Sequence, residues 1–536
     1  MAQGHWLNPY IHNDARVHTE PSRTVMIRRR PPGTSRCLAT ALVALRADAG
    51  WALAQAPAQD PSGQAPAPAL DPFADSRRQV MENVGDVEYI SYFSVGGQTI
   101  AGVFDTGSFE LVVFSAACKT CGMAGKYDPS QSTSHKNGSL NTMQSYGSGD
   151  TYSQEATDMV AIGPFEKRKQ MFWEVVDARM PRLRTARLQA VIGVGPPEAP
   201  AADAWADAKR ALEAVQRYFR EDQPPPADAR TSAREMVKGA LELSNSPTVL
   251  DNFGVRSFSI CMGAHPGSDG YFIWHDKVHT QKPGLFMRVP IVGDHSWSAT
   301  LKNVRLSRLG ARGGLSSTTL GCDGEDGCTV LIDSGTSLIA APGNVIKQIQ
   351  DIIDHLDGDC TDMTSFPTLE FDLGGNLLSL PPDAYMAAVV GTVPAYLERT
   401  VALGSLGGAR PFLRRPLGAR AVIPRNLSVT APVGDFSDDG AAASQCKMLL
   451  MESYMESDSG GPIWIFGFPF FRKYYATFDV GEDASSRALY LAEASDDCRP
   501  AETSSLARSL PHLRRIDISK LAATPLRVGH SKVRRI

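Results

Sequence analysis

The chain has 536 residues, which is room for two or three ordinary domains or for one large two-lobed unit with added loops and tails. Its composition, with 43% hydrophobic and 21% charged residues, is typical of a globular protein, and a net charge of -4 excludes the basic footprint of a nucleic-acid-binding protein. No run of 18 or more apolar residues occurs, so the sequence predicts no transmembrane segment.

The first 54 residues resemble a secretory leader. Three arginines at positions 28–30 precede an apolar stretch at 37–45 and small residues at 51–54, which is the order of a signal peptide, although Arg46 and Asp48 interrupt it. An unstructured leader or a misjudged gene start is the alternative. Residues 55–79 are rich in Ala, Pro and Gln and predict a linker or a propeptide remnant.

Residues 80–283 predict a first β-rich lobe, because short β-branched or aromatic runs alternate with Gly, Asn and Ser. A segment at about 196–243 interrupts this pattern. There, Trp205, Leu212 and Phe219 belong to an apolar set at helical spacing within a charged sequence. We therefore expect an amphipathic helical insertion in this lobe.

Residues 284–497 return to strands and predict a second β-rich lobe, with one helix at 345–353 and a long surface loop at about 389–440. Residues 498–536 are a basic tail, which we expect to be a solvated and partly disordered extension. Two β-rich halves thus follow one another.

The most informative pattern is an internal repeat. Residues 103–108 read Val-Phe-Asp-Thr-Gly-Ser, and residues 331–336 read Leu-Ile-Asp-Ser-Gly-Thr. A single Asp-Thr-Gly is an ordinary turn sequence, but two copies with matching flanks indicate a duplicated lobe. Each copy is followed by an apolar-apolar-Gly element, at 191–193 and 465–467.

With these motifs the chain resembles the pepsin-like aspartic protease family over roughly residues 80–495. The resemblance implies an all-β, bilobal fold of two related lobes with the active-site cleft between them, here with a helical insertion in the N-terminal lobe. It implies an aspartic endopeptidase that cuts polypeptide substrates at acidic pH, prefers apolar residues beside the cut, and needs no cofactor or metal. We expect a monomer in the secretory pathway, either secreted or in an acidic vacuole or lysosome-like compartment.

The resemblance also assigns roles to individual residues. Asp105 and Asp333 are the catalytic pair. The flap that closes over bound peptide carries Tyr146, Gly147, Ser148 and Gly149. The residues that support the two catalytic loops are Thr106, Gly107, Ser108, Ser334, Gly335 and Thr336.

Paired aspartates suit this chemistry. Two carboxylates held close together in a shielded site share one proton, since both cannot ionise at low cost. The ionised member can take a proton from water while the protonated member polarises the scissile carbonyl. Gly107 and Gly335 let the backbone pass close to the carboxylates with N–H groups aimed inward.

One position departs from the family pattern. Val112 stands where the family usually has a Trp whose indole contacts the flap tyrosine, so Tyr146 loses that partner. We expect a looser flap or a wider neighbouring subsite, and altered specificity before lost activity. The alternative function is that of a catalytically silent pepsin-fold binding or inhibitor protein.

Nine cysteines are many for a reducing compartment and favour disulfides. Cys261 and Cys498 are left as a possible pair, and Cys37 would leave with the leader. Sequons for glycosylation occur at Asn137 and Asn426. The resemblance implies the pairs Cys118–Cys121, Cys322–Cys328 and Cys360–Cys446.

Three other patterns suggest different chemistry and are set aside. Asp458 and Ser459 begin a segment like the nucleophile motif of trypsin-like serine proteases, but no Ala-His-Cys-like segment accompanies it, and a turn is expected. His275 and His279 have zinc-ligand spacing only on a helix, and we expect a surface turn there. The Cys-x-x-Cys at position 118 could be a redox or zinc pair, but no second such pair is present.

Overall fold

The computed structural model describes residues 77–293, 295–309, 314–356, 360, 363–390, 445–453, 461–502, 514–517 and 534–535. All of them lie in one compact unit, residues 70–536. The predictions for the leader at 1–54, for most of the linker at 55–79 and of the loop at 389–440, and for Asn426 and Ser459 lie outside the described residues.

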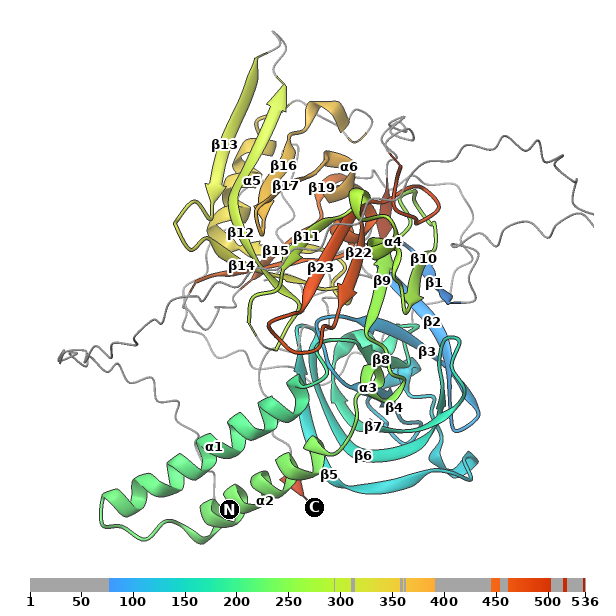
Figure 1. The fold of residues 1–536 in the computed structure, drawn as a ribbon, viewed down its shortest axis with the longest axis vertical. Helices are drawn as coiled ribbons and strands as arrows, with labels where there is room; N and C mark the ends of the chain where they lie inside the picture. Colours follow the sequence, from blue (N-terminus) through green and yellow to red (C-terminus); the bar gives the residue numbers. More distant parts are fainter. Residues whose placement is uncertain are drawn as a thin grey trace, which may run out of the picture. The chain divides into compact units, whose positions relative to one another are not determined.

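The described residues fold mainly into strands, as an all-β, bilobal protein (Figure 1). The first lobe contains the hairpin of β5 and β6 and the strands around it. Its strands are β1 Arg78–Val84, β2 Glu88–Val95, β3 Gln98–Asp105, β4 Leu111–Phe114, β5 Lys136–Tyr146, β6 Gly149–Ala161, β7 Arg168–Arg179 and β8 Ala190–Gly193.

Strands from both halves of the sequence pair with one another at the junction of the lobes. Among the described residues, fourteen strands form one sheet, in the order β11-β23-β22-β9-β10-β1-β2-β3-β8-β4-β7-β6-β5-β25. Strand β9 of the first half lies antiparallel to β22 of the second, so the two lobes share a continuous backbone hydrogen-bond network. The junction strands are β9 Ser257–Cys261, β10 Gly270–Trp274, β11 Met287–Pro290, β22 Tyr474–Asp479 and β23 Ala488–Glu493.

The second lobe has two further sheets. In the described part of the chain, one sheet has the order β17-β16-β12-β14-β21-β15-β20 with β13 paired to β12, and the other has the order β19-β18-β24. Their strands are β12 Ser298–Leu309, β13 Leu315–Gly321, β14 Cys328–Ile332, β15 Ile339–Pro342, β16 Thr368–Leu373, β17 Asn376–Leu380, β18 Met386–Val390, β19 Gln445–Met448, β20 Leu450–Ser453, β21 Ile463–Phe466 and β24 Arg515–Asp517.

The two copies of the sequence repeat adopt the same strand arrangement. In the first lobe β3 runs parallel to β8, with Asp105 opposite Gly193, and β4 lies antiparallel to β8. In the second lobe β14 runs parallel to β21, with Ile332 opposite Phe466, and β15 lies antiparallel to β21. The apolar-apolar-Gly elements are therefore the strands that pair beside each Asp strand.

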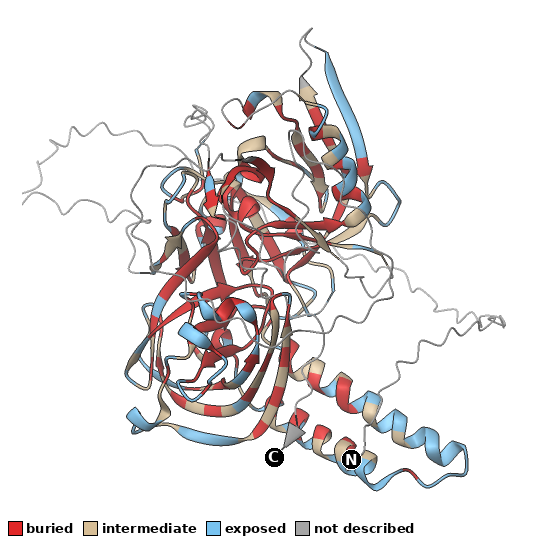
Figure 2. Ribbon diagram, turned by 180° about the vertical axis from the view of Figure 1, so that it is seen from behind, coloured by how far each residue is buried: buried red, intermediate tan, exposed pale blue. Residues whose placement is uncertain are grey.

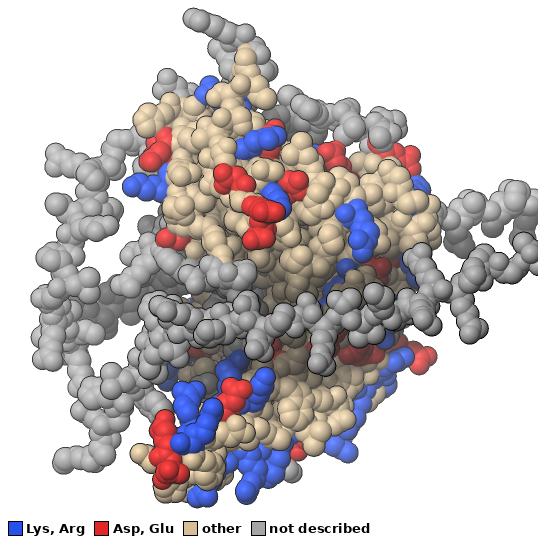
Figure 3. Space-filling view, turned by 60° about the vertical axis from the view of Figure 1, so that its left-hand side comes forward, with Lys and Arg blue, Asp and Glu red and all other residues tan. Residues whose placement is uncertain are grey.

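The helical insertion is an antiparallel hairpin of α1 (Ala199–Arg220) and α2 (Ala227–Ser244). Small residues make close packing possible: Ala204 and Ala208 of α1 share a buried cluster with Met236 and Ala240 of α2. The distal half of the hairpin is exposed (Figure 2), and on the face shown in Figure 3 basic and acidic side chains are interspersed. The hairpin thus packs on the first lobe through the N-terminal half of α1 and the C-terminal half of α2.

The remaining helices are short. The longest, α5, buries Val345, Ile346, Ile349 and Ile353 on one face, which is the spacing of an amphipathic helix. No helix within the described ranges combines the length and the apolar character needed to cross a bilayer. The short helices outside the insertion are α3 Val249–Asn252, α4 Val278–Gln281, α5 Gly343–Ile353, α6 Pro382–Tyr385 and α7 Phe468–Lys473.

Four disulfides occur among the described residues. They are Cys118–Cys121, Cys261–Cys498, Cys322–Cys328 and Cys360–Cys446. The bond between Cys261 and Cys498 ties β9 to the segment that follows β23, so it closes the junction of the two halves.

One sequence prediction is wrong, and one has exceptions within the described residues. The tail is predicted to be a solvated and partly disordered extension, and most of it lies outside the described residues; within the described part, β24 pairs with β18, strand β25 (Arg534–Arg535) pairs with β5, and Ile516 is only 1% exposed. The segment around His279 was expected to be a surface turn, yet His279 lies in α4 and is buried against Tyr490. In both cases the apolar partners come from distant parts of the chain, which local patterns do not reveal.

Candidate active site

The two repeated aspartates come together at the ends of equivalent strands. Asp105 is the last residue of β3, and Asp333 follows β14 directly. Both side chains are 0% exposed, and they lie close enough for each to shift the pKa of the other. The structure therefore joins in one buried pair two residues that lie 228 positions apart.

Each carboxylate receives the same two hydrogen bonds from its own loop. For Asp105, the Gly107 N–H donates to Oδ1 at 2.9 Å and the Ser108 hydroxyl donates to Oδ2 at 2.6 Å. For Asp333, the equivalent donors are the Gly335 N–H at 2.8 Å and the Thr336 hydroxyl at 2.5 Å. These donors fix the orientation of both carboxylates.

The two loop glycines are required by close approach across the pair. A Cβ atom at position 107 would lie 2.8 Å from Cγ of Asp333, and one at position 335 would lie 2.7 Å from Cγ of Asp105. Real Cβ atoms essentially never come this close to another heavy atom, so a side chain at either position would displace the opposite carboxyl. Each glycine therefore lets its loop pass against the carboxyl of the opposite lobe.

The protonation of the pair follows from its burial. Burial raises the pKa of Asp105 well above its ordinary value of 3.8, and the charge of Asp333 raises it further. Burial also raises the pKa of Asp333, although hydrogen bonds from Asp105 and Thr336 oppose this shift. The pair therefore retains one shared proton at pH values where isolated carboxyls have lost theirs.

Two hydroxyls connect the loops of the two lobes. The Thr106 hydroxyl donates to the Ile332 carbonyl at 2.8 Å, and the Ser334 hydroxyl donates to the Phe104 carbonyl at 2.7 Å. The structure also shows a contact that the sequence did not suggest: the Ser337 hydroxyl donates to the Val87 carbonyl at 2.6 Å. The Asp333 loop is thus anchored to the first lobe at two places.

Comparisons with known proteins agree with this geometry. The family described as eukaryotic aspartyl protease matches residues 88–212 and 254–393. The chain belongs to the pepsin-like aspartic protease family. It is 24% identical to cathepsin E-A of Xenopus laevis over 56% of this chain and 68% of that protein. It is 22% identical to cathepsin E of Rattus norvegicus over 75% and 79%, and 25% identical to renin of Ovis aries over 75% and 80%.

The residues expected to form the flap lie at the end of the hairpin of β5 and β6. Tyr146 lies opposite Gly149 in register, and Gly147 and Ser148 form the connecting turn. Gly149 has a φ of 137°, and a Cβ there would collide with the Arg179 carbonyl. The turn of this hairpin therefore needs Gly149 both for its backbone conformation and for its contact with β7.

The position that departs from the family pattern is filled from the neighbouring strand. Val112 lies opposite Trp173 of β7, and both share a buried cluster with Tyr146. The Trp173 indole N–H donates to the Glu110 carboxylate at 2.9 Å. An indole is thus present in the same buried cluster as Tyr146, but it comes from β7 and not from position 112 on β4. Tyr146 is only 6% exposed. Sequence reasoning missed Trp173 because the β4–β7 pairing joins residues 61 positions apart.

The histidines with zinc-ligand spacing do not converge. His279 is in α4, while His275 precedes this helix with a φ of 51°. Among the described residues, no group of three or more His, Cys, Asp or Glu side chains could hold a metal ion.

Proposed function

We propose that this pepsin-like chain is an aspartic endopeptidase that acts at acidic pH. The observation that carries the proposal is the buried pair of Asp105 and Asp333, each with its own loop donors. A peptide carbonyl beside this pair would meet both a general base and a proton donor. Cathepsins E and renin are among its relatives, which supports the same reaction class.

The proposed mechanism uses the pair without a covalent intermediate. The ionised carboxylate takes a proton from a water molecule while the oxygen of that water attacks the scissile carbonyl carbon. The protonated carboxyl donates its proton to the carbonyl oxygen. The product of this step is a tetrahedral diol, and proton return to the leaving nitrogen completes hydrolysis. Thr106, Gly107, Ser108, Ser334, Gly335 and Thr336 hold the geometry, while Tyr146, Gly147, Ser148 and Gly149 close over the peptide.

The expected setting follows from the same features. Four disulfides favour an oxidising compartment, and a pair that keeps its proton above pH 3.8 favours an acidic one. We therefore propose the secretory pathway, with secretion or delivery to an acidic vacuole or lysosome-like compartment. A monomer that prefers apolar residues beside the cut is the accompanying proposal.

The test is cleavage of an unfolded protein between about pH 3 and pH 7. The variants Asp105→Asn and Asp333→Asn should each lose cleavage at every pH, and a statine-type inhibitor should abolish it in the unchanged protein. Asp326→Asn, at an exposed acid of the β13–β14 turn, is the matched control and should cleave normally. Cleavage by either dyad variant at the normal rate would disprove the proposal.

A further inference from the structure

The C-terminal tail buries an arginine in a socket on the first lobe. Arg514 is 2% exposed and directly precedes β24. The Ala388 N–H of β18 donates to the Arg514 carbonyl at 2.8 Å. The next residues form β24, which pairs with β18, and Ile516 is buried. The tail is therefore fixed by its backbone and by two side chains.

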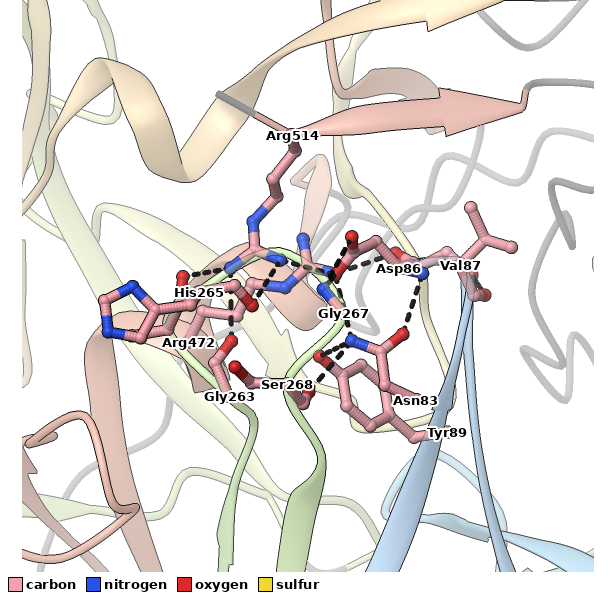
Figure 4. A network of polar contacts seen from close by, with 12 residues as sticks. Asn83, Asp86, Val87, Tyr89, Gly263, His265, Gly267, Ser268, Arg472 and Arg514 are labelled. Carbon is pink, nitrogen blue, oxygen red and sulfur yellow. Dashed lines mark hydrogen bonds and ion pairs between the residues drawn. The ribbon is translucent and has the colours of Figure 1, made fainter. Parts of the chain in front are cut away.

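The socket satisfies the guanidinium with a carboxylate and three carbonyls (Figure 4). Nη1 of Arg514 donates to Oδ1 of Asp86 at 2.5 Å and to the His265 carbonyl at 3.4 Å. Nη2 donates to the Gly263 carbonyl at 3.1 Å and to the Ala264 carbonyl. A planar cation with several donors fits such an arrangement, while a single ammonium group would not reach all of these acceptors.

The socket belongs to a strained turn between β1 and β2. Asp86 has a φ of 61°, in the left-handed region that non-glycine residues rarely adopt. Its conformation is held by several groups: Asn83 accepts from the Asp86 N–H at 2.7 Å, and Arg472 donates to the Asp86 carbonyl at 2.7 Å. The Gly267 N–H donates to the Asp86 carboxylate at 3.1 Å. Arg514 is thus one of several supports of this turn and the one that the tail provides.

The turn leads directly to the Asp333 loop. Val87 follows Asp86, and its carbonyl accepts the Ser337 hydroxyl at 2.6 Å. Ser337 is 3% exposed and follows Thr336, whose hydroxyl donates to Asp333. Three hydrogen bonds and a few residues of backbone therefore connect the guanidinium of the tail with one carboxylate of the pair.

We propose that Arg514 is a positioning residue for the reaction, through which the C-terminal tail sets the orientation of the Asp333 loop. The proposal rests on the proposed function, because it concerns the rate at that site. Arg514 touches neither carboxylate, so it acts by holding the Asp86 turn, and with it the Val87 carbonyl, in the place where Ser337 binds. A tail that left the socket would loosen this anchor.

The experiment compares Arg514→Gln with Arg515→Gln in the full chain. Arg515 is the next residue, has the same chemistry and is exposed, so it is the matched control. The active sites are counted by titration with a tight statine-type inhibitor, and kcat is then expressed per titrated site. We expect Arg514→Gln to lower this kcat about tenfold with little change in KM, since small misplacements of catalytic groups have effects of this size. Arg515→Gln should match the unchanged protein.

A purely structural role of Arg514 gives a different result. It would lower the melting temperature or the fraction of titratable sites and leave kcat per site unchanged, and that outcome overturns the proposal. Ser337→Ala should lower kcat in the same way, and the double variant with Arg514→Gln should lose little more, because both changes break one connection. Independent, multiplicative losses would also contradict it. A full chain that neither cleaves protein nor binds the inhibitor would instead refute the proposed function, and the positioning role with it.

Discussion

Thr106 and Ser334 exchange hydrogen bonds across the junction of the two lobes. The Thr106 N–H donates to the Ser334 hydroxyl oxygen at 3.1 Å, and the Ser334 N–H donates to the Thr106 hydroxyl oxygen at 2.9 Å. Because each hydroxyl also donates to a carbonyl of the opposite lobe, four hydrogen bonds connect the two loops in a nearly symmetric pattern. The serine in the second copy serves as well as the threonine in the first, since only the hydroxyl takes part.

Removal of either hydroxyl should destabilise the protein. Thr106→Ala or Ser334→Ala leaves a buried N–H and a buried carbonyl without partners, which costs about 1–3 kcal/mol for each unsatisfied group. The conservative changes Thr106→Ser and Ser334→Thr keep the hydroxyl and are the controls. Urea unfolding followed by tryptophan fluorescence checks this, and a midpoint for the alanine variants equal to that of the unchanged protein would contradict it.

The carboxyl pair should make stability depend on pH in a defined direction. The pKa of Asp105 is raised well above 3.8 in the folded state, so the folded protein holds a proton that the unfolded chain releases. The stability that this group contributes is present below about pH 3.8 and is lost as the pH rises through the higher folded pKa. Asp105→Asn removes this loss. The melting temperature of the variant, compared with that of the unchanged protein, should therefore be raised most at neutral pH and least at acidic pH.

Thermal unfolding of Asp105→Asn at several pH values between about 3 and 7 measures this effect. Asp326→Asn, at an exposed acid, should show no such growth of the difference with pH. A melting-temperature difference for Asp105→Asn that is constant over the range would contradict the raised pKa.

Restoring the family's usual tryptophan at position 112 should destabilise this protein. Val112 is 2% exposed beside the fully buried Trp173, so a second indole would overpack the cluster at a cost of about 1–3 kcal/mol. The exchange variant, with Val112→Trp and Trp173→Val together, conserves volume and should recover part of the loss. Denaturant unfolding compares the three, and a Val112→Trp protein as stable as the unchanged one would show that the space for an indole is still open.

His279 should weaken the fold in acid. Burial lowers the pKa of His279 below 6.5, and the charges of Asp479 and Asp276 only partly oppose this shift. Its Nδ1 atom has no hydrogen-bond partner among the described residues. The unfolded chain therefore takes up a proton at this residue more readily than the folded one, and stability is lost as the pH falls below about 6.5.

The variant His279→Phe keeps the ring that stacks on Tyr490, at 4.3 Å between centroids, and removes the titrating group. It should retain more of its melting temperature between about pH 6.5 and pH 4 than the unchanged protein. The same substitution at the exposed His355 is the control and should leave the pH dependence as it was. Identical pH profiles for His279→Phe and the unchanged chain would refute the prediction.

The sequence was sufficient to predict the features that repeat or that depend on local chemistry. The two Asp-hydroxyl-Gly-hydroxyl copies were informative because a turn of this kind needs those residue types in that order. The helices near Leu212 and Val345 were predictable because their apolar residues recur at helical spacing. These signals lie within a few residues of one another.

What could not be predicted depends on contacts between distant residues. Nothing in the sequence near Trp173 indicates that it lies opposite Val112, and Arg514 is one of nine basic residues in a tail with weak patterning. Their partners, Glu110 and Asp86, are 63 and 428 positions away. Such contacts are fixed by strand pairing and by burial of charge, which emerge only in the folded chain.

Residues 534–535 also occupy part of the outer edge of the β5–β6 hairpin. Strand β25 pairs with β5 at Leu140 and Asn141, on the side of β5 that faces away from β6. An unpaired strand edge presents N–H and C=O groups that can bind a strand from another molecule and begin aggregation. Since the chain's own terminus takes this place, a foreign strand would first have to displace it. At Leu140 and Asn141 the β5–β6 hairpin is thereby shielded from intermolecular β-pairing by residues 534–535 of its own polypeptide.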